Sequence, residues 1–170
     1  MNRTKTNTPG FTIVELLIVI VVIGVLAAVT VVAFNGIQQR ANNTKTQQAV
    51  AAYAKAMILY AQDNGVYPLP TNLVCLGDEY TEAEKCDGSA DLTRAAALKV
   101  VLEEYLPGTP PRPAIADVGG RRGALYHAQS YILFTQEGVT QCPSIGGTTR
   151  TLGDTAVTGG MWCRASLPAL

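Results

Sequence analysis

Residues 10–34 read GFTIVELLIVIVVIGVLAAVTVVAF, and this stretch decides how the whole chain is organised. From Leu16 to Phe34 it holds no charged residue, and nearly every position is Val, Ile, Leu or Ala. At a rise of about 1.5 Å per residue, a helix of this length spans the roughly 30 Å hydrocarbon core of a bilayer. The stretch therefore predicts a membrane-spanning helix.

One acidic residue, Glu15, stands at the start of the apolar run. A charged side chain inside a membrane is expensive and usually needs a partner, so such a residue is a candidate for function. The structural alternative is that Glu15 accepts hydrogen bonds from free N–H groups in the first turn of a helix that begins near Phe11. The residues alone leave both roles open.

The segment before the apolar run, residues 1–10, is short and polar and contains Arg3 and Lys5 but no acid. It fits a cytoplasmic leader that precedes a helix inserted with its N-terminus inside. A plain signal anchor is one alternative. A cleaved secretory signal with a small-residue site at Val25-Leu26-Ala27 is another, but the apolar core exceeds the usual length of about 7 to 15 residues and contains Glu15.

The motif from Gly10 to Ile20, followed by Ile23-Gly24-Val25-Leu26-Ala27-Ala28, resembles the class III signal of type IV pilins and of the pseudopilins of secretion and competence machines. This resemblance implies that a prepilin peptidase cuts between Gly10 and Phe11 and N-methylates Phe11. It also implies that Glu15 pairs with the Phe11 amine of a neighbouring subunit. Cleavage would create the missing cation, because an exposed α-amino group is mostly protonated at neutral pH.

The same resemblance sets expectations for partners and location. The chain should form a homo-oligomer, a helical filament whose core is made of the apolar helices. Besides the prepilin peptidase, the expected partners are a pilus assembly platform, minor pilins and, before assembly, membrane lipid. We expect a single-pass protein of the cytoplasmic (inner) membrane that moves into an extracellular pilus or a periplasmic or cell-wall pseudopilus.

Beyond the membrane segment, apolar residues return at the spacing of one helical stripe. They are Ala49, Ala52, Tyr53, Ala56, Met57 and Tyr60. No proline occurs before Pro68, and Asn64-Gly65 supplies a C-terminal stop. Residues 11–34 and 35–64 are therefore predicted to form one helix, whose second, amphipathic half packs on the rest of the chain.

The remaining residues, 65–170, are predicted to form a globular head. Asp91 can cap a short helix that runs to about Leu106. Segments rich in Thr, Val and Tyr, separated by glycines, then indicate an antiparallel sheet. The expected strands are 124–128, 131–136, a short piece near Val139, 148–152 and 161–164. The fold class is α+β, a long N-terminal helix packed against an antiparallel sheet, which resembles the pilin architecture.

Four cysteines lie in the predicted head, and an oxidising compartment outside the membrane favours disulfides between them. Three pairings are possible in principle. Proximity in the sequence favours Cys75 with Cys86, which would close an acidic loop, and Cys142 with Cys163. The second pair would staple the last strands, as in many pilins.

Nothing in the sequence indicates an enzyme. His127 sits in a strand pattern, where a structural role is expected, and Asp117 and Asp154 lack the spacing of a metal-binding loop. No metal or other cofactor is expected. The 13 basic and 13 acidic residues balance, and Arg121-Arg122 is a small basic pair, so nucleic-acid binding is unsupported.

The sequence thus predicts a structural subunit of a type IV pilus-like filament, processed after Gly10 and polymerised through its apolar helix. A pseudopilin of a type II secretion or competence (DNA-uptake) system is the alternative within the same family. A membrane-anchored extracellular binding domain, uncleaved and monomeric, is the alternative from another class.

Overall fold

The computed structural model describes residues 10–69, 73–77, 80–81, 85–88, 90, 92–106, 108–109, 111–127, 131–150 and 154–170. The described part of the chain divides into two compact units, one ending at Gln38 and one beginning at Gln39. Residues 1–9 of the expected leader, the Asp91 cap and the ends of two expected strands, Ala128 and Leu152, lie outside the described residues.

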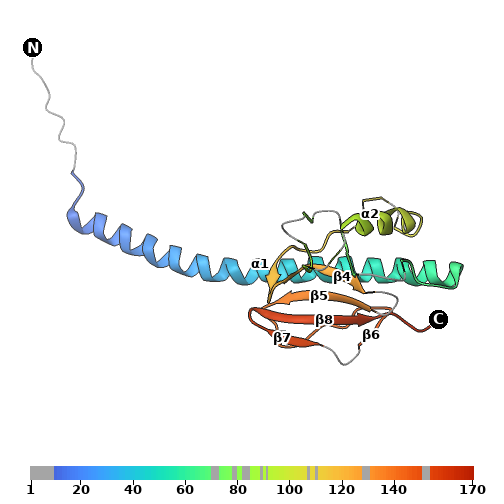
Figure 1. Ribbon diagram of the computed structural model, residues 1–170. Helices are drawn as coiled ribbons and strands as arrows, with labels where there is room; N and C mark the ends of the chain where they lie inside the picture. The colour runs from blue at the N-terminus through green and yellow to red at the C-terminus, as the bar shows by residue number, and fades with distance from the viewer. Residues whose placement is uncertain are drawn as a thin grey trace, which may run out of the picture. The chain divides into compact units, whose positions relative to one another are not determined.

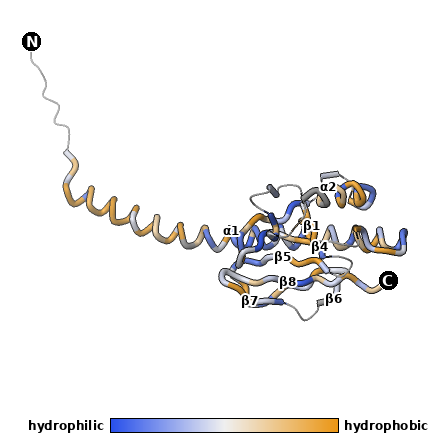
Figure 2. The backbone as a smooth tube through the Cα atoms, viewed as in Figure 1, coloured by the Kyte–Doolittle hydropathy of each residue, from blue (hydrophilic) through white to orange (hydrophobic). Residues whose placement is uncertain are grey.

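Helix α1 runs from Ile13 to Asn64 without a break in its assignment (Figure 1). Its sequence contains no proline. Gly65 follows the last helical residue. It has a φ of 72°, and its N–H donates to the Ala61 carbonyl at 2.9 Å, which is typical of a helix that ends with a left-handed glycine. Figure 2 shows that the beginning of α1 is almost uniformly hydrophobic, whereas polar residues enter its later part. The prediction of one long N-terminal helix is confirmed.

The head is built on an antiparallel sheet with the strand order β1-β4-β5-β8-β6, and β7 pairs with β8 beside this path (Figure 1). The strands are β1 (Leu73–Cys75), β4 (Ala124–His127), β5 (Tyr131–Glu137), β6 (Thr149–Arg150), β7 (Thr155–Val157) and β8 (Gly160–Ser166). The two long strands, β5 and β8, pair from Tyr131 opposite Ser166 to Glu137 opposite Gly160. The α+β fold class is therefore confirmed.

Several details of the predicted head were wrong. Helix α2 covers Leu92–Val101, shorter than expected, because the chain passes into turns after Val101. Cys75, expected at the start of an acidic loop, is the last residue of strand β1. No strand forms near Val139, since β5 ends at Glu137 and Gly138 turns the chain with a φ of 62°. A separate two-stranded sheet, β2 (Asp117–Val118) with β3 (Arg121–Arg122), was not expected.

The main core lies between α1 and one face of the sheet. The sheet contributes Val74, Tyr126, Ile132, Phe134, Cys163 and Ala165, and α1 contributes Val50, Tyr53, Ala54, Met57 and Ala61. These sheet residues alternate along their strands, as a face that meets a helix requires. The stripe predicted on the second half of the helix is thus the side that packs against the head.

The opposite face of the sheet is covered by a second, smaller cluster. It joins Cys75, Tyr80, Cys86, Ala90, Leu125 and Leu133. Tyr80 reaches this site because Gly123 gives it room: a Cβ on Gly123 would lie 2.0 Å from the Tyr80 hydroxyl, and its φ of 64° also favours glycine. The described residues between Cys75 and α2, among them Tyr80, Cys86 and Ala90, therefore cover this face of the sheet, and we call them the lid.

Candidate assembly site

Helix α1 begins with a reciprocal capping box. The Glu15 carboxylate accepts hydrogen bonds from the Thr12 N–H at 2.8 Å and from the Thr12 hydroxyl at 2.7 Å. The Glu15 N–H in turn donates to the Thr12 hydroxyl oxygen at 3.2 Å. This arrangement satisfies free donors of the first helical turn. Both residues follow Gly10, so removing residues 1–10 would leave the capping box in place.

The capping box does not neutralise the charge of Glu15. Among the described residues, the ion pairs of the structure lie elsewhere, at Arg121 and Arg122. The other polar side chain of the apolar segment is Thr30, whose hydroxyl donates to the Ala27 carbonyl at 2.9 Å. Thr30 is therefore compatible with an apolar environment, whereas Glu15 has no cationic partner among the described residues.

The side chains that follow Glu15 form an exposed apolar surface. The large apolar residues from Phe11 to Phe34 with a described side chain are each at least half exposed, with Phe11 at 81% and Phe34 at 65%. Within the described residues, α1 is the one helix long and apolar enough to cross a membrane by length and composition. An exposed apolar surface of this extent is typical of a helix that lipid or another protein covers.

The predicted cleavage point lies just outside this helix. Gly10 and Phe11 are non-helical and exposed, and α1 starts at Ile13. Their peptide bond is thus accessible in backbone that carries no helical hydrogen bonds. Gly10, Phe11 and Glu15 therefore lie together at one end of the apolar segment.

The four cysteines form the two disulfides expected in the head. Cys75 bonds to Cys86 with Cα atoms 5.6 Å apart, and Cys142 bonds to Cys163 with Cα atoms 5.5 Å apart. The first closes the lid over the sheet, and the second joins the segment after β5 to the middle of β8. They are distinct from the N-terminal site and serve the head alone.

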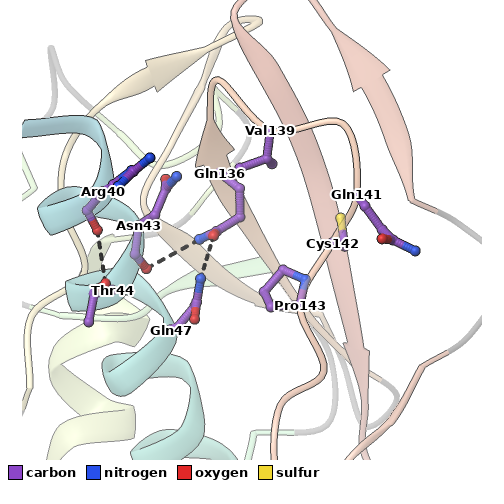
Figure 3. Close-up of a pocket in the computed structure, with 9 residues that line it drawn as sticks. All are labelled: Arg40, Asn43, Thr44, Gln47, Gln136, Val139, Gln141, Cys142 and Pro143. Carbon is purple, nitrogen blue, oxygen red and sulfur yellow. Dashed lines mark hydrogen bonds between the residues drawn. The ribbon is translucent and has the colours of Figure 1, made fainter. Parts of the chain in front are cut away.

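A group of polar side chains, which we call the polar clamp, fixes the first turns of the head part of α1 to the end of strand β5 (Figure 3). Asn43 pairs with the backbone of Glu137 in both directions, donating to its carbonyl at 2.8 Å and accepting from its N–H at 2.7 Å. Gln47 donates to the buried side chain of Gln136 at 2.7 Å, and Asn42 donates to the Glu137 carboxylate at 2.9 Å. These contacts border an open polar hollow of about 490 Å³.

Replacing Asn43 by alanine is expected to lower the free energy of unfolding by about 1–3 kcal/mol, because two backbone groups of Glu137 would lose their partners. Thr44→Ala is the matched control, since Thr44 is exposed and bonds only to Arg40 of its own helix at 2.9 Å. Urea unfolding of the detergent-solubilised chain, followed by the fluorescence of Trp162, measures the difference. Equal midpoints for the two variants would show that the polar clamp adds nothing.

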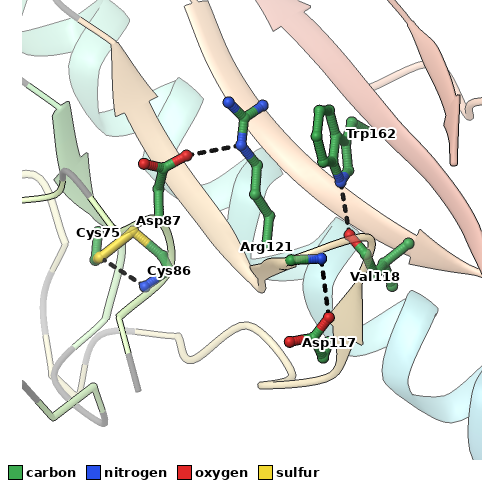
Figure 4. Close-up of polar contacts among 8 residues, drawn as sticks. Cys75, Cys86, Asp87, Asp117, Val118, Arg121 and Trp162 are labelled. Atoms are coloured by element: carbon green, nitrogen blue, oxygen red, sulfur yellow. Dashed lines mark hydrogen bonds and ion pairs between the residues drawn. A yellow bond between two sulfur atoms is a disulfide. The ribbon is translucent and has the colours of Figure 1, made fainter. Parts of the chain in front are cut away.

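A second set of contacts ties the lid to the β2–β3 hairpin (Figure 4). Arg121 donates to Asp87 at 2.7 Å and lies over the Trp162 ring at 4.1 Å. The Trp162 indole donates to the Val118 carbonyl at 2.6 Å. Arg121 thus links the lid, the hairpin and strand β8, and it is occupied by structural contacts.

The other residues considered from sequence also have structural roles. Arg122 pairs with Asp117 at 3.3 Å, so both members of the basic pair lie beside carboxylates. Asp154 accepts from the Arg164 N–H at 3.1 Å, and His127 stacks on Tyr131 with ring centroids 4.8 Å apart. In the part of the chain that the structure describes, no group of three or more His, Cys, Asp or Glu residues could hold a metal ion.

Sequence reasoning missed Thr12 and the polar clamp. Thr12 was readable, because a threonine three residues before a glutamate at a helix start is the signature of a capping box. The polar clamp left no such signal, since Asn43 and Glu137 are 94 positions apart. Ordinary polar residues that meet only in the folded head have no recognisable spacing.

Comparison with known proteins finds a similarity that includes the N-terminal residues. Residues 5–31 match the family model described as the prokaryotic N-terminal methylation motif. The matched range contains Gly10, Phe11, Thr12 and Glu15 and most of the exposed apolar surface. The residues of the N-terminal site therefore lie within the part of the chain that is similar to this motif.

Relatives in several bacteria match roughly two fifths of the chain. The type II secretion system core protein G of Escherichia coli K12 is 39% identical over 66 residues, which cover 39% of this chain and 46% of that protein. The protein of the same name from Vibrio cholerae is 36% identical over 68 residues, and that from Aeromonas hydrophila is 34% identical over 64 residues. Together with the motif, these matches confirm the resemblance to the pilin and pseudopilin family.

The similarity is limited in extent. The chain spans somewhat less than half the length of these curated relatives, 46% of the first two and 45% of the third. No solved structure matches the chain. The comparisons thus bear on the family and leave the particular role of this chain to its own residues.

Proposed function

We propose that this chain is a pseudopilin, a non-enzymatic structural subunit of a pilus-like filament of the type II secretion kind. The observation that carries the proposal is Glu15, one acid in an exposed apolar helix that matches the methylation motif. The relatives named above belong to type II secretion systems, which favours the secretion filament over the surface pilus that the sequence alone suggested.

The proposed pathway follows from the chemistry of the site. The precursor is held in the cytoplasmic membrane by the first half of α1, with residues 1–10 as a cytoplasmic leader. A prepilin peptidase removes the leader after Gly10 and methylates the amine of Phe11. The new cation then pairs with Glu15 of a neighbouring copy as the subunit leaves the lipid, on an assembly platform and beside minor subunits.

The physical advantage of this pairing is register. A carboxylate and an ammonium that leave water each lose hydration, and their attraction recovers that loss only when they meet in good geometry. The apolar surface from Leu16 to Phe34 supplies cohesion at many positions, but it does not select one axial position by itself. A charge pair at the end of this surface selects one axial position, because only there are the carboxylate and the ammonium both paired.

The first test is the mass of the protein purified from cells. We expect an N-terminus at Phe11 carrying one added methyl group. The control is Gly10→Val, which should leave the leader attached; a Cβ at Gly10 meets nothing within 4 Å, so this change acts on the peptidase and not on the fold. An intact Met1, or a cut after Ala27, would refute the proposal in favour of an anchored extracellular domain or a secretory signal.

A surface pilus of type IV is the second candidate, because the methylation motif fits both kinds of filament and more than half of each named relative lies outside the match. Deleting the chromosomal copy separates the two. Loss of secretion with surface fibres unchanged would support the pseudopilin, and loss of long fibres with secretion unchanged would support the pilus.

A further inference from the structure

The part of α1 that packs on the sheet leaves one face free along its length. Its exposed residues recur at intervals of three and four, so they lie on one side of the helix. They are Ala41, Thr44, Lys45, Gln48, Lys55, Leu59, Gln62 and Asp63. We call this surface the exposed face of α1.

The charged residues on the part of α1 that belongs to the head are all basic until the last turns of the helix. Between Gln39 and Gln62 the charged residues are Arg40, Lys45 and Lys55, with no acid among them. All three side chains are exposed. The ion pairs among the described residues involve other arginines, so these three cations have no carboxylate partner there.

The surface of the head near the C-terminal end of α1 carries negative charge. Asp63 on α1 and Glu103 and Glu104 after α2 are exposed, and we call these three residues the acidic end. Tyr105 holds the two segments together, donating from its hydroxyl to Asp63 at 2.9 Å and packing edge-on against Tyr60 at 5.8 Å.

The titration of Tyr105 reflects this negative surrounding. The hydrogen bond to Asp63 is the largest cause of the raised pKa of the Tyr105 hydroxyl, and the charges of Asp63 and Glu104 add to it. Along α1 the head therefore carries basic residues first and the acidic end last, with one base, Lys99, in the last turn of α2 before Glu103.

We propose that the acidic end of one copy docks on the basic residues Arg40, Lys45 and Lys55 of the next copy along the filament. The inference rests on the proposed function and names the surfaces through which the heads meet. Two different surfaces that complement each other make a head-to-tail contact, and such a contact repeats without closing into a dimer. Charge complementarity between two exposed surfaces favours a second copy of this chain as the occupant.

The arrangement of the charges also sets an axial offset. All copies in a helical filament point the same way, so neighbouring α1 helices are parallel. Without an offset, Lys45 and Lys55 would face like charges. An offset of about 12–35 Å, the axial distance from Asp63 back to Lys55 and to Arg40 at 1.5 Å per residue, places acid opposite base instead. Repulsion at one position and attraction at another together select the register.

Chemical cross-linking of native filaments tests the contact. A carbodiimide joins a lysine amine to a carboxylate that touches it, without adding a spacer. Mass spectrometry is expected to find Lys45 or Lys55 joined to Glu103, Glu104 or Asp63 in filaments, and not in detergent-dispersed monomers. Filaments without these links would overturn the docking contact and leave the filament proposal standing. A wild-type chain that forms no filaments would overturn the proposed function and this contact with it.

Charge variants give a second, independent test. Glu103→Lys with Glu104→Lys is expected to lower filament yield at least about tenfold, and adding Lys45→Glu with Lys55→Glu to restore most of it, because the interaction is pairwise. Glu103→Gln with Glu104→Gln is compared with Ala156→Lys and Thr158→Lys, which change the net charge equally at exposed positions on β7 and the turn after it. Equal losses in these two variants, or no rescue by the swap, would overturn the proposal.

Discussion

Replacing Glu15 by alanine is expected to leave the chain inserted in the membrane but to reduce filament yield by at least about a hundredfold. The reason is that the cation proposed to pair with Glu15 would be buried without a partner. The alanine helix is more compatible with lipid than the wild type, so insertion should not suffer. In the filament, however, the Phe11 ammonium of a neighbouring copy would lie in apolar surroundings with no anion. Membrane fractionation measures insertion, and electron microscopy of sheared fibres measures assembly.

The capping box makes a single substitution ambiguous, because Glu15→Ala also removes the hydrogen bonds to Thr12. Glu15→Gln resolves the ambiguity, since glutamine at this position can still complete a capping box but carries no charge. We expect Glu15→Gln to fail in assembly as Glu15→Ala does. Thr12→Ala keeps the charge and loses the hydroxyl, so it should assemble more readily than either.

The opposite ranking would assign a different role to the site. If Glu15→Gln formed filaments in normal amounts while Thr12→Ala did not, Glu15 would serve to start the helix and not to pair with a cation. The two roles are compatible with the same resting geometry, in which Glu15 is exposed and bonded to Thr12. They differ only in whether charge is needed after the subunit leaves the membrane.

The long N-terminal helix could be predicted because the interactions that form it join residues close in the sequence. An unbroken apolar run without proline gives a helix whatever the rest of the chain does. The Asn64-Gly65 stop likewise depends only on neighbouring residues. Strands β5 and β8 were found for a similar reason, since each is seven residues long and a turn glycine stands at one of its ends, Gly138 after β5 and Gly159 before β8.

The parts that escaped prediction depend on distant partners. Strands β1, β2, β3 and β7 are two or three residues long, so each exists because a neighbouring strand pairs with it. The piece expected near Val139 failed because Asn43, from a different element, takes up the backbone of Glu137 and the chain turns at Gly138. In the site, sequence indicated Glu15 and its hydrogen bonds to the first turn of the helix, but not that Thr12 supplies them.

Removing the Cys142–Cys163 disulfide, as Cys142→Ala with Cys163→Ala, is expected to destabilise the whole head by about 3–5 kcal/mol. Both sulfur atoms belong to the main core between α1 and the sheet, and Cys163 lies in β8, opposite Phe134 of β5. The matched control is Cys75→Ala with Cys86→Ala, whose sulfur atoms lie in the smaller cluster under the lid. There we expect a loss of about 2–3 kcal/mol, confined to the lid and β1.

Loop size cannot explain a difference between the two variants. The disulfides close segments with sequence separations of 21 and 11, and a twofold change in loop length alters closure entropy by only about 0.6 kcal/mol. Position in the fold must decide, because β8 pairs with β5, β6 and β7 while β1 pairs only with β4 among the described strands. Amide hydrogen exchange distinguishes the two variants. Loss of Cys142–Cys163 should speed exchange in α1, β5 and β8, and loss of Cys75–Cys86 should leave those elements protected. Similar exchange in both variants would mean that the lid and the main core unfold as one unit.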